Sequence, residues 1–257
     1  MKLFLLALAA AALTAQIPRL ERAPRIDGDL ADWRSHAFSD GLWDLERLRH
    51  SPWYDPAINR LTLHPGESGV DLEARYYIAW DAENIYLGAD VTDNVNDVAD
   101  PAHAPKRWYY KDAICWFLEA PRRAAGQKFG EGDNAFCFVI DAKRPDYAAW
   151  WRHGAPGRTY IEEPLPKDAV EYSIRRGRNG NFTLEARVAL KPTFGASTPR
   201  WTGPREGLEL GMEIVHTDPD GADYGGHFLI YGRGDDDATW GRFTLTGPQS
   251  PVERKPK

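Results

Sequence analysis

The chain has 257 residues, with 32 Lys and Arg against 38 Asp and Glu, and a formal net charge of −6. The two signs are mixed along the sequence without a basic stripe, which excludes the kind of surface that binds nucleic acid phosphates. The aromatic content is high, at 10 Trp, 11 Tyr and 10 Phe, which predicts that some of these rings lie on the surface and stack against a ligand.

The N-terminus has the pattern of a secretory signal. Lys2 precedes an apolar run from Leu3 to Leu13, and the small residue Ala15 follows. The run is shorter than the roughly 20 residues that span a bilayer. We therefore expect a signal peptide over residues 1–16 and a secreted or periplasmic protein with no membrane association after cleavage. A single domain over residues 17–246 and a flexible tail over 247–257, rich in Pro and charge, complete the predicted organisation.

Alternation of apolar and polar residues with a period of two predicts strands along most of the chain. The clear cases are Leu72 to Trp80, Ile85 to Val91, Phe182 to Val188 and Leu208 to Ile214, and the shorter ones are 112–119, 136–140, 169–175, 227–231 and 241–245. Asp81–Asn84 and Asn179-Gly180 are predicted hairpin turns. Many short strands without a sustained helical pattern predict an all-β fold, as a sandwich or barrel. Residues 50–69 are predicted to form a long irregular insertion.

The two cysteines, Cys115 and Cys137, both lie in apolar strand-like runs. Export makes a disulfide possible, because secreted proteins fold in oxidising surroundings. Buried free thiols and one bridge between neighbouring strands both fit the sequence at this point.

Five segments, in chain order, resemble the family 9 carbohydrate-binding modules. They are Ile26–Trp33, Tyr77–Leu87 with the following Val91–Asp93, Lys111–Glu119, Asn181–Val188 and Trp240–Leu245. The resemblance implies an antiparallel, jelly-roll-like β-sandwich that binds mono- and oligosaccharides, or chain ends of a polysaccharide, between two aromatic side chains. It also implies structural calcium and work alongside a glycoside hydrolase, which we expect here as a separate polypeptide.

The resemblance also points to candidate carbohydrate-binding residues. By spacing, Tyr109 takes the place of the first clamping aromatic, with Trp108, Tyr110 and Arg107 beside it. A family Glu on the next strand is replaced by Cys115, and the strand that usually offers Gln and Arg reads Phe136-Cys137-Phe138-Val139. The second aromatic belongs in the loop at 232–237. Trp240 follows this loop at the position of a packing residue and is also a candidate for carbohydrate binding.

Trp150 and Trp151 form a second candidate for ligand contact. Neighbouring residues of a strand point to opposite faces, so the two rings cannot both enter one core. At least one of them is expected to be accessible or to lie under a loop. Binding and loop packing both remain open for this pair.

An acidic turn offers a candidate cation site. Asp218, Asp220 and Asp223 alternate around Gly221, and such oxygen donors suit calcium, although a plain solvated turn fits as well. Two further clusters, Asp93 with Asn94 and Asp97, and Asp235–Asp237, are similar. His216 and His227 flank the turn and are expected to be structural.

No catalytic or phosphate-binding motif is present, which favours a non-catalytic binding domain. One alternative is electron transfer by a b-type haem, with Met212 or His216 as an axial ligand. Another is glycan hydrolysis by paired carboxylates. A structural envelope protein with a degenerate site is the last alternative.

Overall fold

The computed structural model describes residues 14–43, 48, 72–93, 107–126, 129–140, 148–155, 158–177, 181–199, 201–219 and 226–250. Most of the predicted signal peptide, the whole insertion at 50–69 and the last residues of the tail lie outside these ranges.

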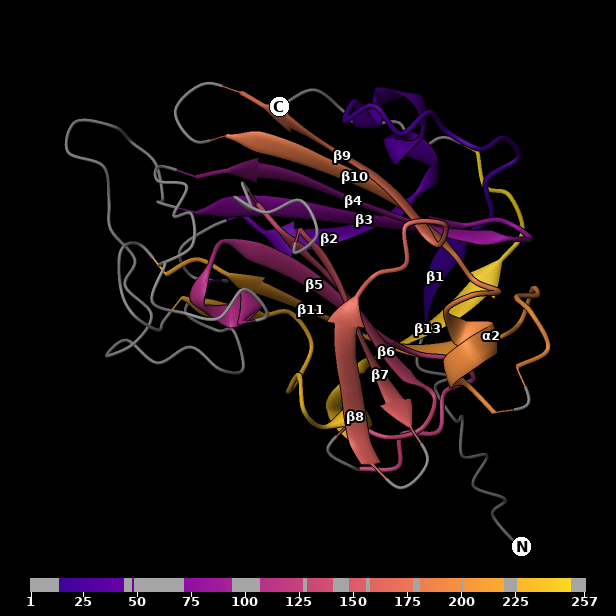
Figure 1. Cartoon of the computed structure of the whole chain (residues 1–257). Coiled ribbons are helices and arrows are strands. Elements are labelled where there is room, and N and C mark those ends of the chain that lie inside the picture. The colour runs from indigo at the N-terminus through magenta and orange to yellow at the C-terminus, as the bar shows by residue number, and fades with distance from the viewer. Residues whose placement is uncertain are drawn as a thin grey trace, which may run out of the picture.

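Two β-sheets pack face to face (Figure 1). Sheet A has the order β1-β13-β11-β5-β6-β7-β8, with β12 paired to β11, and sheet B has the order β2-β3-β4-β10-β9. The strands of sheet A are β1 Ala15–Pro18, β5 Ala113–Glu119, β6 Asp133–Val139, β7 Ala149–Ala155, β8 Arg158–Pro164, β11 Glu209–Thr217, β12 His227–Leu229 and β13 Gly241–Thr246. The strands of sheet B are β2 Phe38–Leu42, β3 Glu73–Trp80, β4 Asn84–Thr92, β9 Val170–Arg176 and β10 Phe182–Ala189.

Neighbouring strands are antiparallel except β1 and β13, which run parallel. The predicted all-β antiparallel sandwich is therefore confirmed. The four clearest alternating runs place their apolar residues in the core between the sheets, as the period of two requires. The predicted hairpin at Asp81 joins β3 to β4, and Asp81 Oδ1 accepts the backbone N–H groups of Glu83 (2.8 Å) and Asn84 (2.7 Å).

Four strands were not predicted from the sequence, namely β1, β2, β7 and β8. Strand β7 reads AWWRHGA and is apolar on both faces, so it does not alternate. Strand β8 reads RTYIEEP and lies at the edge of sheet A, and it carries charged residues on both faces. Strand β1 begins at Ala15, inside the range predicted for the signal peptide.

The outer face of sheet B is covered by the N-terminal segment with the short 3-10 turns η1 (Leu30–Asp32) and η2 (Arg34–His36) (Figure 1). Leu30 and Trp33 pack over Gly88 of β4, where an added Cβ would lie 2.8 Å from Leu30 and 3.0 Å from Trp33. The glycine thus lets the segment approach the sheet closely.

Glu185 of β10 fastens this segment to sheet B. Its buried carboxylate accepts Trp33 Nε1 (2.7 Å) and the backbone N–H groups of Asp27 and Gly28 (2.9 Å each). Gly28 has a φ of +83° and an added Cβ there would lie 2.9 Å from Arg175 Cβ, so this position requires glycine. The segment Ile26–Trp33 is therefore an anchoring motif of the fold.

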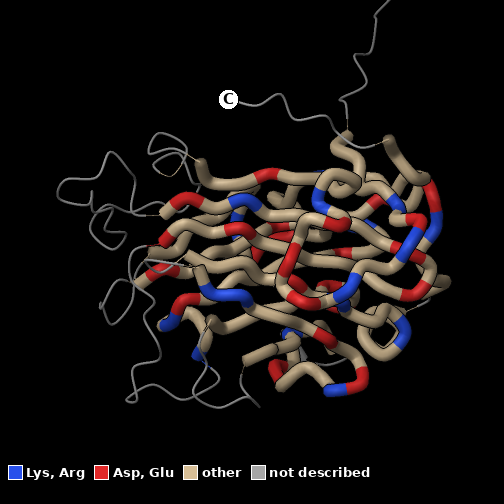
Figure 2. The backbone as a smooth tube through the Cα atoms, turned by 90° about the horizontal axis from the view of Figure 1, so that it is seen from above, with Lys and Arg blue, Asp and Glu red and all other residues tan. Residues whose placement is uncertain are grey.

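Among the residues that the structure describes, helical structure is limited to short turns, and the α-helix α2 spans Phe194–Ser197. Within the described ranges, no helix is both long and apolar enough to cross a membrane. Figure 2 shows acidic and basic residues interspersed along the described backbone.

Most aromatic side chains fill the interior. Among the described residues, the large hydrophobic side chains with substantial exposure are Trp43 (37%) and Tyr160 (43%). Most of the other large hydrophobic side chains pack in three apolar clusters, one between the sheets and one on the outer face of each sheet. The high aromatic content is therefore explained mainly by packing, and it is weaker evidence for surface stacking than the sequence suggests.

Candidate functional site

The outer face of sheet A carries a compact apolar cluster, which we call the outer cluster. It is built from alternate residues of β5, β6, β7 and β11, which a strand presents to the same face. Its members are Trp108, Ala113, Cys115, Phe117, Phe129, Ala135, Cys137, Val139, Trp150, Val215, Leu229 and Trp240, with the partly buried Tyr109 packed against them.

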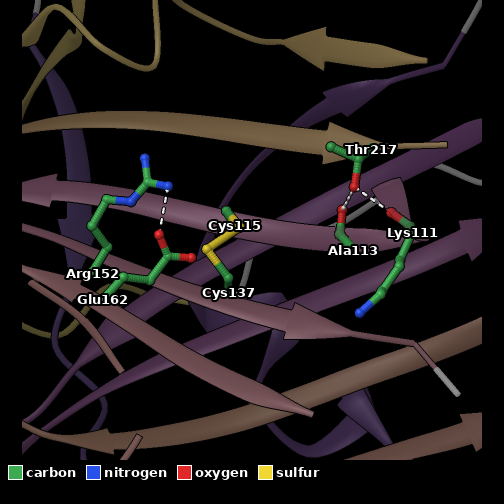
Figure 3. The surroundings of a disulfide bond; sticks show 7 residues. All are labelled: Lys111, Ala113, Cys115, Cys137, Arg152, Glu162 and Thr217. Carbon is green, nitrogen blue, oxygen red and sulfur yellow. Dashed lines mark hydrogen bonds and ion pairs between the residues drawn. A yellow bond between two sulfur atoms is a disulfide. The ribbon is translucent and has the colours of Figure 1, made fainter. Parts of the chain in front are cut away.

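A disulfide lies in the middle of this face. Cys115 and Cys137 are directly paired on β5 and β6, with Cα atoms 4.0 Å apart, and their sulfurs are bonded (Figure 3). Of the two arrangements that the sequence left open, the structure has the bridge. A disulfide therefore stands where the resemblance places a ligand-binding Glu.

Aromatic rings surround the disulfide. Trp108 lies on the 3-10 turn η3 (Trp108–Tyr110) and contacts Phe117 edge-on, with ring centroids 6.5 Å apart. Trp240 contacts Phe117 at 5.8 Å and Phe129 at 6.4 Å. These rings come from separate loops and strands, so the fold gathers them on one face.

An ion pair adds polar groups to the same face. Arg152 of β7 and Glu162 of β8 are directly paired across the strands, and Arg152 Nη2 lies 2.9 Å from Glu162 Oε2 (Figure 3). The guanidinium lies 4.5 Å from the ring centre of Tyr160, 5.8 Å from that of Trp108 and 5.9 Å from that of Phe129. The charged Arg152 guanidinium thus lies among three aromatic rings, an arrangement in which cation–π attraction is effective.

Three buried polar atoms on this face have no hydrogen-bond partner among the described residues. They are Trp108 Nε1, Arg152 Nε and Glu162 Oε1. Buried polar atoms are nearly always satisfied in folded proteins, and each exception costs about 1–3 kcal/mol. Two donors and one acceptor therefore remain available for groups from outside the protein.

The structure brings several predicted site residues to this face. Trp108, Trp150 and Trp240 belong to the outer cluster, and Tyr109 packs against it. Tyr110 and Arg107 lie next to them. The Tyr110 ring is 5.0 Å from that of Tyr109, and the Arg107 guanidinium is 5.8 Å from the Tyr110 ring. The Trp residues are buried, so Tyr109 and Tyr110 are the more accessible of these aromatic rings.

Trp151 points the other way, as the alternation of a strand requires. It is 4% exposed, lies in the core between the sheets, and donates Nε1 to Asn134 Oδ1 (3.0 Å). Its placement gives it a packing role.

Sequence reasoning did not identify Tyr160, Glu162 or Arg152 as candidate site residues. Arg152 shares a face with Trp150, two residues earlier, and Glu162 shares a face with Tyr160 in the same way. The pattern was hidden because β8 lacks apolar alternation and was not recognised as a strand.

The predicted cation ligand Asp218 lies beside Asp93 and Asp112, with one carboxylate oxygen from each within 4.8 Å of the others. Asp220 and Asp223 lie outside the described residues. All three clustered carboxylates are buried, and oxygen donors of this kind fit calcium, the cation that the resemblance implies.

The residues considered as axial haem ligands, Met212 and His216, have packing and hydrogen-bonding roles in the fold. Met212 and His216 both point into the core between the sheets. His216 Nδ1 is 2.7 Å from Tyr76 Oη, and His227 Nε2 is 2.9 Å from the Tyr109 carbonyl. These contacts give both histidines structural roles. Hydrolysis is not favoured either, because the carboxylates that cluster most closely are buried.

Comparison with known families identifies the fold. The family model described as "Carbohydrate family 9 binding domain-like" matches residues 53–247, which is most of the chain. The chain belongs to this family. The family 9 assignment accounts for the sandwich and for the order of the motifs in the sequence.

Two solved structures of a family 9 carbohydrate-binding module from Caldicellulosiruptor kristjanssonii share the fold. The one in complex with cellotriose has a TM-score of 0.58 and 13% identity, and the match covers 95% of this chain and 100% of that chain. The one in complex with glucose has a TM-score of 0.57 and 14% identity, covering 93% and 100%. No protein of curated function matches the sequence.

This family 9 domain differs from the pattern that the resemblance implies at the centre of its outer face. Cys115 is bonded to Cys137 and offers no carboxylate there. Glu162, from the edge strand β8, brings a carboxylate to the same face, and Arg152 brings a guanidinium. The Arg152–Glu162 pair of this face therefore lies at the β7–β8 edge of sheet A.

Proposed function

We propose that this protein is a non-catalytic carbohydrate-binding domain whose saccharide lies on the outer face of sheet A, between the Tyr109 side and the β7–β8 edge. Aromatic rings there would cover the apolar face of a sugar. Arg152 and Glu162 would hydrogen-bond its hydroxyl groups. Family membership supports the class of function, and the chemistry of this face supports its location.

The observation that carries the proposal is the set of three unsatisfied polar atoms, Trp108 Nε1, Arg152 Nε and Glu162 Oε1. A saccharide hydroxyl both donates and accepts, so it can satisfy two donors and one acceptor together. All three atoms are buried, and the ring centre of Tyr160, which is 43% exposed, lies 4.5 Å from the Arg152 guanidinium. A rotation of the Tyr160 side chain would open them to a ligand.

The first ligands to test are neutral glucose-based saccharides. The related structures hold cellotriose and glucose, and they share the fold of this chain at low identity. Glu162 already balances the charge of Arg152, so the face does not call for an acidic ligand.

Location and partners follow from the same proposal. The signal-like residues 1–16 and the Cys115–Cys137 bridge both favour export to the periplasm or the extracellular medium. There the domain would hold a saccharide for a separate glycoside hydrolase. Calcium at Asp93, Asp112 and Asp218, joined by the predicted Asp220 and Asp223, would stabilise the loops near Tyr109.

Isothermal titration with glucose, cellotriose and a panel of other glycans tests the proposal. Glu162→Gln removes a charge at constant shape, and Tyr109→Ala removes a partly exposed ring. We expect each to weaken binding by about tenfold or more, since one hydrogen bond to a charged group is worth about 1.5–3 kcal/mol. Trp43→Ala is the matched control, because Trp43 is a partly exposed ring (37%) at the end of β2 in sheet B.

Two outcomes would count against the proposal, at different levels. If the folded protein binds no glycan of the panel, carbohydrate binding itself is refuted. If a glycan binds but both site variants retain the affinity of the Trp43→Ala control, the function stands and the proposed face is wrong.

A further inference from the structure

A residue with a strained backbone, Phe129, lies among the rings of the proposed binding face. It belongs to the connection between β5 and β6, and its φ is +45°. Residues with bulky side chains rarely adopt this left-handed conformation. Strain of this kind persists only where the surrounding structure holds it, and it is found most often at ligand-binding sites and switches. The conformation of Phe129 therefore raises the question of what its side chain does.

The aromatic contacts of Phe129 show what keeps its ring in place. The ring is 4% exposed, and its centre lies 6.0 Å from that of Phe117, 6.2 Å from that of Tyr160 and 6.4 Å from that of Trp240. Burial of the ring in the outer cluster is favourable and offsets the strained backbone. A ligand that covered the same apolar surface would make this burial of the Phe129 ring unnecessary.

The backbone next to Phe129 is seated directly on β7. The Gly130 carbonyl lies so close to Gly154 that an added Cβ at Gly154 would be 1.8 Å from the carbonyl oxygen. Gly130 is also tied to the start of β6, because its N–H donates to Asp133 Oδ2 (2.6 Å) and its carbonyl accepts the N–H of Asp133 (3.1 Å). This seat fixes the backbone and presents the Phe129 side chain to the binding face.

The Phe129 ring lies beside the polar pair of that face. Its centre is 5.9 Å from the Arg152 guanidinium, and the centre of the Tyr160 ring is 4.5 Å from the same group. Arg152 Nε and Glu162 Oε1 are buried there and have no hydrogen-bond partner within the described part of the chain. The rings that shield this pair thus keep two polar atoms away from any ligand.

We propose that Phe129 is an internal competitor of the saccharide, with a ring that shields Arg152 in the free protein and rotates away when the sugar binds. This role rests on the proposed carbohydrate-binding function and names a residue that sets its affinity. The apparent affinity of such a site is the intrinsic affinity reduced by the fraction of molecules that are open. Removal of the ring should therefore tighten binding, whereas the loss of a ring that contacts the sugar would weaken it.

Isothermal titration of the full chain with glucose and cellotriose tests the sign of this effect. We expect Phe129→Ala and Phe129→Gly to bind about fivefold or more tightly than wild type. Glycine adopts a positive φ without strain, so Phe129→Gly remains informative if Phe129→Ala folds poorly. Trp43→Ala is the matched control, because it removes a ring whose centre lies 5.2 Å from the Arg75 guanidinium on sheet B. It should leave the affinity unchanged.

Fluorine NMR follows the ring itself in protein that keeps an aromatic side chain at this position. With para-fluorophenylalanine at position 129, we expect the resonance of the free protein to be that of a buried ring. Added cellotriose should shift it and make it sensitive to the exchange of light for heavy water. A ring with a purely structural role stays buried and shows neither change.

Three outcomes separate this proposal from the proposed function. If both Phe129 variants bind with wild-type or lower affinity, Phe129 does not compete with the sugar. If the fluorine resonance remains that of a buried ring while saccharide is bound, the ring does not move. Either result overturns the role of Phe129 and leaves carbohydrate binding standing. If neither wild type nor any variant binds a glycan, the proposed function is refuted and the role of Phe129 with it.

Discussion

The two outer faces of the sandwich differ in whether the buried polar atoms of their Trp and Glu side chains have hydrogen-bond partners. Each face has a buried Trp and a Glu from its own sheet, Trp33 with Glu185 on sheet B and Trp108 with Glu162 on sheet A. On sheet B, Glu185 accepts Trp33 Nε1 and two backbone N–H groups, and the N-terminal segment closes over the pair. On sheet A, Trp108 Nε1 and Glu162 Oε1 both lack a partner among the described residues.

Under the proposed function, this difference separates a structural face from a binding face. A face whose polar groups are all paired by the chain itself has nothing left to recognise a ligand. A face that has unsatisfied hydrogen-bond donors and acceptors among aromatic rings is less stable without a ligand. A ligand that satisfies these groups gains binding free energy there. We therefore expect matched substitutions to affect stability on sheet B and affinity on sheet A.

The largest expected contrast comes from Gln substitutions. In Glu185→Gln, an amide N–H₂ must face N–H donors, so we expect a loss of about 2–3 kcal/mol in the free energy of unfolding. Glu162→Gln can retain its bond to Arg152 and loses no other recorded hydrogen bond, so its loss should stay below about 1 kcal/mol. Urea denaturation of both variants measures the contrast, and equal losses would contradict it.

His216 makes a pH-dependent contribution to the stability of the core that lies between the two faces. Burial lowers the pKa of His216 to about 3, below its usual value near 6.5. The unfolded chain binds this proton and the native chain does not, so stability present above pH 6.5 is lost as pH falls toward 3. We expect a loss of about 2 kcal/mol between pH 8 and pH 5 from this group. His216→Asn should remove this contribution of about 2 kcal/mol from the pH profile of stability, and an unchanged profile would exclude it.

The smallest contrast separates the two tryptophans. Trp33→Phe and Trp108→Phe remove similar volumes from buried sites, with 2% and 5% exposure. The first also breaks the bond to Glu185, whereas the second removes a donor that has no recorded partner. Trp33→Phe should therefore cost about 1 kcal/mol more in thermal unfolding. If the costs are the same, Trp108 Nε1 is already satisfied.

The sequence predicts the strands whose two faces differ, because alternation reports a face toward the core and a face away from it. It fails for β7, where Trp150 and Trp151 are both buried, one on each face of sheet A. The predicted aromatic part of the site, around Trp108 and Tyr109, depends on a local run of residues. Its polar part, Arg152 with Glu162, depends on pairing between β7 and β8, which no local pattern encodes.

The acidic clusters could not be predicted from the sequence either, because their members are far apart along the chain. Asp237 was noted in a charged run at 235–237, and Asp93 in a separate one. Each meets its partners only through the fold, Asp237 with Glu119 and Asp133, and Asp93 with Asp112 and Asp218. Spacing along the chain therefore identified single members of these clusters and not the complete sets.

Because the Cys115–Cys137 disulfide lies on the outer face, the redox conditions of the expression host affect any binding experiment. The bond closes a loop with a sequence separation of 22, for which chain entropy predicts about 3 kcal/mol of stabilisation. A reducing cytosol would yield the same polypeptide with two thiols at the centre of the proposed binding face. Recombinant protein should therefore be made by export or refolded under oxidising conditions, and a thiol assay should precede any conclusion that the domain binds nothing.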